Sequence, residues 1–185
     1  MTTTGSGGHR EKSMDIDMDI AISLTNKRIM NTVVDLINSV LMGSSSNATI
    51  NDYFLGGSRR FGWGHSGSDI DIFVGTDDRY VMVAEMLSSN LFQRDSQFPV
   101  EHYEALGTHL ETILSGMDVD IIVMDTKDFE ELRSEHQLVE DYLVLNPQIL
   151  LLVCRLRNVS ELSGKTVYRS VRDVYVGGRY IARQG

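Results

Sequence analysis

The chain has 185 residues, of which 42% are hydrophobic and 23% are charged, and its formal net charge is −9. This composition is ordinary for one globular domain and excludes a wholly disordered chain. There is no apolar run of the ~20 residues that a membrane-spanning helix needs and no apolar signal-peptide core at the start, so we expect a cytoplasmic protein. The single cysteine, Cys154, excludes an intrachain disulfide and a multi-cysteine zinc site.

The N-terminal part of the chain predicts a tail and then a helix. Residues 1–13 are rich in glycine, serine, threonine and charge without an apolar period, so we expect disorder. Residues 14–20 alternate aspartate with apolar residues, which fits an edge strand or the lead into a helix. Between 26 and 42, apolar residues recur at the spacing of an amphipathic helix, and Gly43 with its following serines ends that pattern.

A strand, a glycine-rich turn and a second strand are predicted next. The strands cover residues 51–55 and 69–74. Because side chains alternate along a strand, Asp69 and Asp71 share one face and the intervening aliphatic residues share the other. Two like charges side by side are costly unless a cation lies between them. Mg²⁺ prefers carboxylate oxygens together with substrate phosphates, so a divalent metal site is predicted here.

The turn between these strands has the residues of a phosphate-binding loop. Gly56 and Gly57 allow backbone N–H groups to approach an anion closely, and Ser58 adds a hydroxyl donor. Arg59 and Arg60 supply cations suited to phosphate oxygens, although a surface position explains them equally well. The sequence therefore predicts a phosphate site next to the carboxylates.

The middle of the chain predicts a helix and a hairpin. Residues 77–89 have helical spacing, with Asp77 as the predicted N-cap, and residues 91–106 are assigned to irregular structure. Two β-like runs, 109–114 and 118–124, are joined by Ser-Gly-Met and predict a hairpin. Its second strand carries two aspartates on one face, at 118 and 120, and the spacing alone leaves open which of them is a third metal ligand.

The last third of the chain is expected to be helical. Asp128 and Glu131 resemble a capping box at the start of a helix that runs to about residue 145. Further helices are predicted at 147–157 and 165–176. We expect residues 14–127 to form the core of the domain and 128–185 a helical extension of the same domain.

Charge is distributed unevenly along the chain. From residue 155 to the end there are seven basic and two acidic residues, a balance of +5, which leaves −14 for the remainder. A polyanionic acceptor could bind such a basic segment, although these residues could equally be solvated helix faces.

Several of these residues together resemble a known family. Gly57-Ser58, followed eleven residues after the serine by Asp69-Ile70-Asp71-Ile72, is similar to the signature of the DNA polymerase β-like nucleotidyltransferase superfamily. Within it, Gly-Ser-Arg-Arg-Phe-Gly and Ser-Asp-Ile-Asp look most like the minimal nucleotidyltransferases. That family takes a third carboxylate from a later strand, and Val119-Asp120-Ile121-Ile122-Val123 fits this pattern. The resemblance covers roughly residues 53 to 124.

The resemblance implies an α+β nucleotidyltransferase fold, with a small mixed β-sheet packed against helices and a C-terminal helical extension. It implies that Asp69 and Asp71 bridge two Mg²⁺ or Mn²⁺ ions, while Asp120 binds the ion that activates the acceptor hydroxyl. The implied nucleotide-binding residues are Gly56, Gly57, Ser58, Arg59, Arg60 and Ser68. The implied reaction transfers NMP from an NTP such as ATP to a hydroxyl acceptor and releases pyrophosphate.

The residues do not identify the acceptor. A small molecule, a protein hydroxyl and an RNA end all fit, whereas a membrane partner is not expected. A toxin-antitoxin-type role with a protein partner, or a non-catalytic NTP-binding domain, is the alternative. A dinucleotide-binding site is excluded because the glycines at 62, 64 and 67 lead into a strand and not a helix. The five histidines show no zinc-hydrolase spacing.

Overall fold

A computed structural model describes residues 8–61, 68–94 and 107–148, and side chains from residue 25 onward. Its centre is a five-stranded sheet in the order β1-β2-β5-β4-β3. The strands are β1 Asp52–Leu55, β2 Ile70–Thr76, β3 Gln93–Arg94, β4 Thr108–Leu114 and β5 Met117–Asp125. Only the β2–β5 pair is parallel among these strands, and the other neighbours are antiparallel. The expected α+β class, with a small mixed sheet packed against helices, is confirmed.

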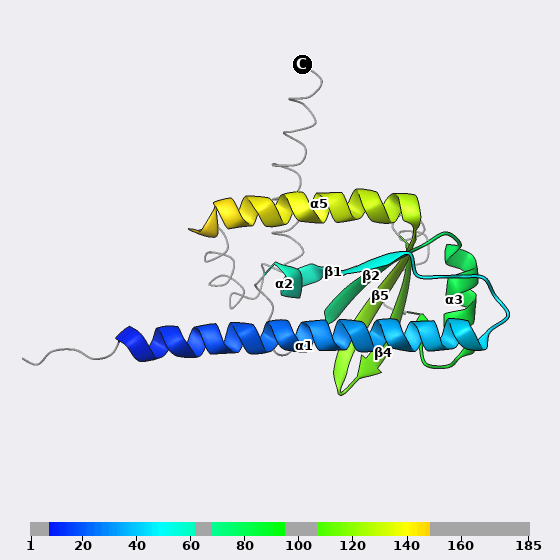
Figure 1. Cartoon of the computed structure of the whole chain (residues 1–185), viewed down its shortest axis with the longest axis horizontal. Helices are drawn as coiled ribbons and strands as arrows, with labels where there is room; N and C mark the ends of the chain where they lie inside the picture. Colours follow the sequence, from blue (N-terminus) through cyan, green and yellow to red (C-terminus); the bar gives the residue numbers. More distant parts are fainter. Residues whose placement is uncertain (1–7, 62–67, 95–106, 149–185) are drawn as a thin grey trace, which may run out of the picture.

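Helices cover both faces of the sheet. They are α1 Gly8–Gly43, α2 Gly57–Arg60, α3 Arg79–Ser88 and α5 Thr126–Leu145. Figure 1 shows α1 below the sheet and α5 above it, running along opposite faces. The short helix α2 follows β1 directly, so the glycine-rich turn lies at one end of the sheet. None of the helices in the described ranges is long and apolar enough to cross a membrane.

The larger part of the core lies between the sheet and the pair α1 and α3. Alternate residues of β2 and β5 point to this face, which is the period of a half-buried strand. Helix α1 contributes a stripe at i, i+4 spacing that begins at Ile29. The fully buried members include Val33, Ile37, Ile70, Ile72, Val74, Met82, Met86, Val119, Ile121 and Val123. This packing fixes which face of β2 carries the aspartates.

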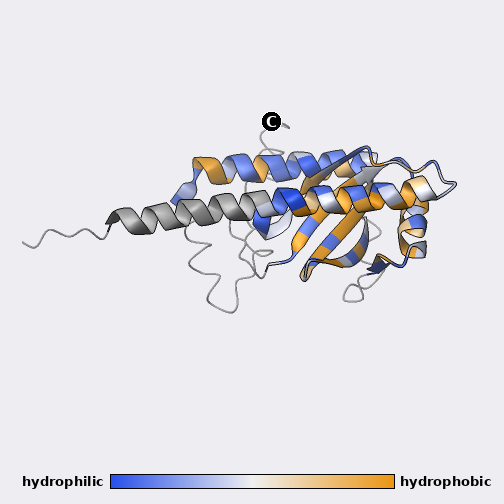
Figure 2. Ribbon diagram, turned by 60° about the horizontal axis from the view of Figure 1, so that its bottom comes forward, coloured by the Kyte–Doolittle hydropathy of each residue, from blue (hydrophilic) through white to orange (hydrophobic). Residues whose placement is uncertain are grey.

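A second, aromatic cluster joins the opposite face of the sheet to α5. Phe129 of α5 is buried against Phe54 of β1, with ring centroids 5.2 Å apart. Gly75 of β2 makes room for this ring, because a Cβ there would lie 2.8 Å from a Phe129 ring carbon. Figure 2 shows that the strands are largely apolar and α5 largely hydrophilic, and the buried residues of α5 are Phe129, His136, Val139 and Leu143.

Most of the predicted elements in the described ranges are present. The hairpin between β4 and β5 is confirmed, and its turn places Ser115 and Gly116 at φ 54° and 79°. The strands at 51–55 and 69–74 correspond to β1 and β2. The helix predicted at 26–42 is confirmed as the C-terminal half of α1.

Several local predictions differ from the structure. Within residues 91–106, which were assigned to irregular structure, Gln93–Arg94 form the short strand β3. Residues 8–13 lie within α1, so the expected disorder was wrong there. Residues 14–20 also lie within α1, so of their two expected alternatives the lead into a helix is confirmed and the edge strand is not. The N-cap of α3 is Asp78, whose side chain accepts a hydrogen bond from Val81 N at 3.1 Å. Asp77 instead accepts from Asn51 at 2.6 Å, a partner distant in sequence that local spacing cannot reveal.

The C-terminal predictions are only partly covered. Helix α5 begins at Thr126, with Asp125 at the N-cap position and without a side-chain cap bond, so the capping box at Asp128 does not start the helix. Asp125 pairs instead with Arg79 at 3.6 Å, which attaches the start of α5 to α3. Residues 147–148 are helical, and the rest of the predicted helix at 147–157 lies outside the described residues. The helix at 165–176, the basic segment and residues 1–7 lie outside them as well.

Candidate metal centre beside the glycine turn

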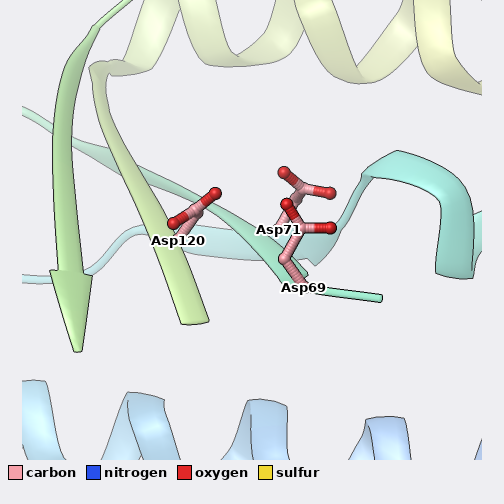
Figure 3. A group of neighbouring side chains, drawn as sticks. All are labelled: Asp69, Asp71 and Asp120. Atoms are coloured by element: carbon pink, nitrogen blue, oxygen red, sulfur yellow. The ribbon is translucent and has the colours of Figure 1, made fainter. Parts of the chain in front are cut away.

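The register of the sheet brings the predicted carboxylates together. In the parallel pair of β2 and β5, Asp71 lies opposite Asp120. Both side chains lie on the face opposite Ile72 and Ile121, which are buried against α1 and α3. Asp69 precedes β2 by one residue. Figure 3 shows the three carboxylates together, on the side of the sheet facing away from α1.

The distances suit one or more small divalent cations. One carboxylate oxygen from each aspartate lies within 4.8 Å of the others. Two oxygens on opposite sides of a Mg²⁺ ion lie about 4.2 Å apart, because each bond is about 2.1 Å long. Small rotations of the side chains therefore reach bonding distance, and carboxylates are the ligands that Mg²⁺ and Mn²⁺ prefer. The donor set fits the metal that the sequence predicts.

The structure distinguishes between the two aspartates of β5. Asp120 is half-buried and belongs to the cluster, whereas Asp118 is exposed and is not part of it. The register between the two strands is the cause. The pairing of β2 with β5 begins at Ile70 and Val119, so Asp118 lies one residue before the first pair. Sequence spacing alone could not decide this point. Metal binding at the cluster itself stays a prediction.

The cluster concentrates negative charge at one end of the sheet. Asp71 and Asp120 are adjacent on the same face, and like charges in that arrangement are destabilising by a few tenths to ~1 kcal/mol. Asp69 is exposed and adds a third carboxylate. A bound cation would remove this repulsion.

The glycine turn is packed against the same cluster. The Gly56 N–H donates to the Asp71 carbonyl at 2.9 Å. Gly57 has φ +60°, and a Cβ on this residue would collide with the Asp71 carboxylate. A Cβ on Gly56 would collide with the ring of Phe73. A side chain at either position would therefore force Asp71 or Phe73 to shift, a reason for glycine here that the sequence did not reveal.

The two predicted arginines bind oxygen atoms of the protein. Arg60 donates to Glu140 Oε2 at 2.9 Å, and its guanidinium lies 5.3 Å from the centroid of the Phe54 ring. Arg59 is buried and donates to the carbonyl oxygens of Ser68 and Asp69. Their predicted nucleotide contacts, like those of Gly56, Gly57, Ser58 and Ser68, stay predictions.

Burial has an electrostatic consequence for Arg59. Desolvation lowers the pKa of its guanidinium, and the negative charge of Asp69 acts in the opposite direction. An arginine remains protonated in proteins even so. The chain therefore keeps a permanent positive charge next to the backbone of Asp69.

Two residues near the site escaped the sequence analysis. Asn26 of α1 is buried and accepts a hydrogen bond from Arg59. Asn26 lies three residues before Ile29 and therefore on the same face of α1 as the buried apolar stripe. A polar residue on that face was the sequence signal that could have identified it. Glu140 of α5 is the partner of Arg60 and lies 80 residues away, with no signal in the local sequence.

Comparisons with known proteins give limited information. No protein-family model matches the chain, and neither does any curated protein. The polymerase core of TRAMP, an RNA surveillance complex, is a similar solved structure at 18% identity and a TM-score of 0.37, covering 76% of this chain and 47% of that one. A cytoplasmic RNA terminal U-transferase is similar at 16% identity and a TM-score of 0.36, covering 70% and 41%. The chain thus spans less than half of each, and these scores are too low to transfer an activity.

Proposed function

We propose that this chain is a nucleotidyltransferase, which transfers NMP from an NTP to a hydroxyl acceptor. The observation that supports the proposal most strongly is the cluster of Asp69, Asp71 and Asp120, with carboxylate oxygens within 4.8 Å beside a tight glycine turn. Carboxylates from neighbouring strands, next to a loop suited to phosphate, are the arrangement that metal-assisted phosphoryl chemistry requires.

In this proposal each residue has a defined task. Asp69 and Asp71 would hold both metal ions, and Asp120 would hold the ion next to the acceptor. The bound ions would neutralise charge on the triphosphate and lower the pKa of the acceptor hydroxyl. Gly57 and Ser58 contact the β- and γ-phosphates, with Ser68 at the other end of the turn.

The reaction is an in-line displacement at the α-phosphorus. The acceptor oxygen forms a bond to this phosphorus while the bond to the bridging oxygen of the β-phosphate breaks, and pyrophosphate leaves. The acceptor proton passes to Asp120 or to water. Asp120 is suited to this role because it is half-buried at the centre of the sheet and is fixed opposite Asp71 by the β2–β5 ladder.

To test the proposal, the chain is incubated with each NTP labelled with ³²P at the α-phosphate, with Mg²⁺ or Mn²⁺, and with a cell extract that supplies the acceptor. The measurement is the amount of label that becomes attached to an acceptor. We expect metal-dependent incorporation that Asp69→Asn and Asp71→Asn abolish while the circular dichroism spectrum is preserved. Asp118→Asn is the matched control on β5 and should retain activity. Undiminished incorporation in both site variants would refute the proposed site.

Two further measurements, NTP binding and co-purification, separate the alternatives. Metal-dependent binding of NTP without incorporation into any acceptor favours a non-catalytic NTP-binding domain. A protein that co-purifies stably with the chain and suppresses incorporation favours a toxin-antitoxin-type partnership.

A further inference from the structure

Arg59 is buried and hydrogen-bonded to protein oxygen atoms, unlike an arginine that is exposed to bind phosphate. Its residue exposure is 7%, although it lies in the four-residue helix α2 at the surface of the sheet. The guanidinium is engaged on two sides. Nε lies 3.0 Å from the Ser68 carbonyl and 3.1 Å from the Asp69 carbonyl, and Nη2 lies 2.6 Å from Ser68 O. On the other side Nη1 donates to Asn26 Oδ1 at 2.9 Å.

The backbone that Arg59 binds lies immediately before the first paired residue of β2. Asp71 and Asp120 lie within the β2–β5 ladder, which begins at the pair Ile70 and Val119. Asp71 is fixed a second time by the Gly56 N–H. Ser68 and Asp69 precede the ladder, and their carbonyl oxygens accept hydrogen bonds from the guanidinium. These hydrogen bonds hold the backbone from which the Asp69 side chain projects.

Asn26 attaches the Arg59 guanidinium to helix α1. Its exposure is 5%, and it extends the stripe of α1 that packs under β2. Because a buried amide is costly without a partner, Asn26 and Arg59 satisfy each other. Through this pair, the core helix α1 is connected to the backbone of Asp69, whose carboxylate belongs to the cluster on the other face of the sheet.

We infer that Arg59 is a positioning residue that fixes Asp69 as a metal ligand, with Asn26 as its anchor. This assignment rests on the proposed metal centre, and it replaces the phosphate contact predicted for Arg59. A planar guanidinium can bind two carbonyl groups and one amide oxygen at once, whereas a lysine ammonium can supply the charge without that fork. Charge alone is therefore insufficient at this position.

The experiment measures Mn²⁺ affinity without nucleotide, using electron paramagnetic resonance of free Mn²⁺ with the full chain. Partners that orient a metal ligand typically affect metal affinity by 10–100-fold. We expect Arg59→Lys to weaken Mn²⁺ binding by about tenfold and Asn26→Ala to weaken it in the same direction. The double variant should bind no more weakly than Arg59→Lys alone, because both changes break one chain of contacts. Arg28→Ala, which removes an exposed arginine of α1, should bind as the wild type does.

Thermal denaturation separates positioning from general support of the fold. A residue with only a structural role lowers the melting temperature but leaves the Mn²⁺ affinity of the folded protein unchanged. A phosphate ligand leaves Mn²⁺ affinity unchanged and weakens binding of a non-hydrolysable NTP analogue. Either of these results for Arg59→Lys would overturn the inference. Should Arg59→Lys fail to fold, Asn26→Ala decides the question by the same measurement.

A reference variant, Asp69→Asn, distinguishes this inference from the proposed function. If Asp69→Asn weakens Mn²⁺ binding and Arg59→Lys does not, the inference fails and the metal centre stands. If Asp69→Asn has no effect on Mn²⁺ binding, both fail. If both variants weaken Mn²⁺ binding but the wild type transfers no nucleotide, the positioning role stands and the proposed activity fails.

Discussion

At the scale of single residues, the site depends on how closely two segments of backbone approach each other. Gly57 lies against the Asp71 carboxylate in a left-handed conformation, at φ +60°. Such a residue has two separate constraints, the backbone angle and the space for a side chain. A matched pair of glycines in this chain allows the two to be separated. Gly116 also has a positive φ, +79°, but a Cβ added to it would point into open space, with nothing within 4 Å.

Gly57→Ala is expected to weaken Mn²⁺ binding by at least about tenfold, because the new methyl group displaces a metal ligand. The positive φ also costs about 1–2 kcal/mol of folding free energy. Gly116→Ala should show a similar loss of stability with unchanged Mn²⁺ affinity. Calorimetric titration and thermal denaturation of both variants give the comparison. Equal Mn²⁺ affinities for the two variants would show that the turn does not need its close approach to Asp71.

At the scale of elements, α5 is attached to the sheet mainly by its aromatic contacts. Phe129 is 1% exposed. Its ring packs against Phe54 of β1 and over Gly75 of β2, where there is no side chain in its way. The ion pair of Arg133 with Asp52 joins α5 to β1 at the surface, where both side chains are about half exposed. Exposed ion pairs contribute little to stability, so burial of Phe129 is expected to dominate.

Phe129→Ala should lower the free energy of unfolding by about 3–5 kcal/mol, the usual cost of removing a buried aromatic ring. Val144→Ala on the same helix is the control, because Val144 is 74% exposed. Its effect should remain within about 0.5 kcal/mol. Urea denaturation of both variants measures the difference. Losses of similar size would mean that α5 is not attached through this cluster.

At the scale of the whole molecule, folding gathers carboxylates that an unfolded chain keeps apart. The chain already carries a net charge of −9, and three of its aspartates meet at one end of the sheet. A ligand that binds only the folded state stabilises it, by about 2.7 kcal/mol at a concentration 100 times its dissociation constant. Divalent cations should therefore raise the stability of the entire domain.

Mg²⁺ is expected to raise the melting temperature of the wild type, and a chelator to reverse the increase. Asp120→Asn should be slightly more stable than the wild type without metal, by about 0.2–1 kcal/mol, because a like-charge neighbour of Asp71 is removed. The same variant should lose the stabilisation by Mg²⁺. Asp118→Asn, on the same strand but outside the cluster, should keep it. If instead Asp118→Asn abolished the Mg²⁺ effect, the third ligand would be Asp118.

The sequence by itself determined the strand-turn-strand unit around Gly57 and the common face of Asp69 and Asp71. Both features are local, since alternation along a strand and the need for glycine in a tight turn involve residues close in sequence. It also predicted the hairpin of β4 and β5 from its turn residues. The spacing left Asp118 and Asp120 open and the family resemblance pointed to Asp120, but only the register between β2 and β5 shows that Asp120, and not Asp118, lies beside Asp71. Likewise, the partners of Arg59 and Arg60 on α1 and α5 lie 33 and 80 residues away, and packing of the helices on opposite faces of the sheet decides those contacts.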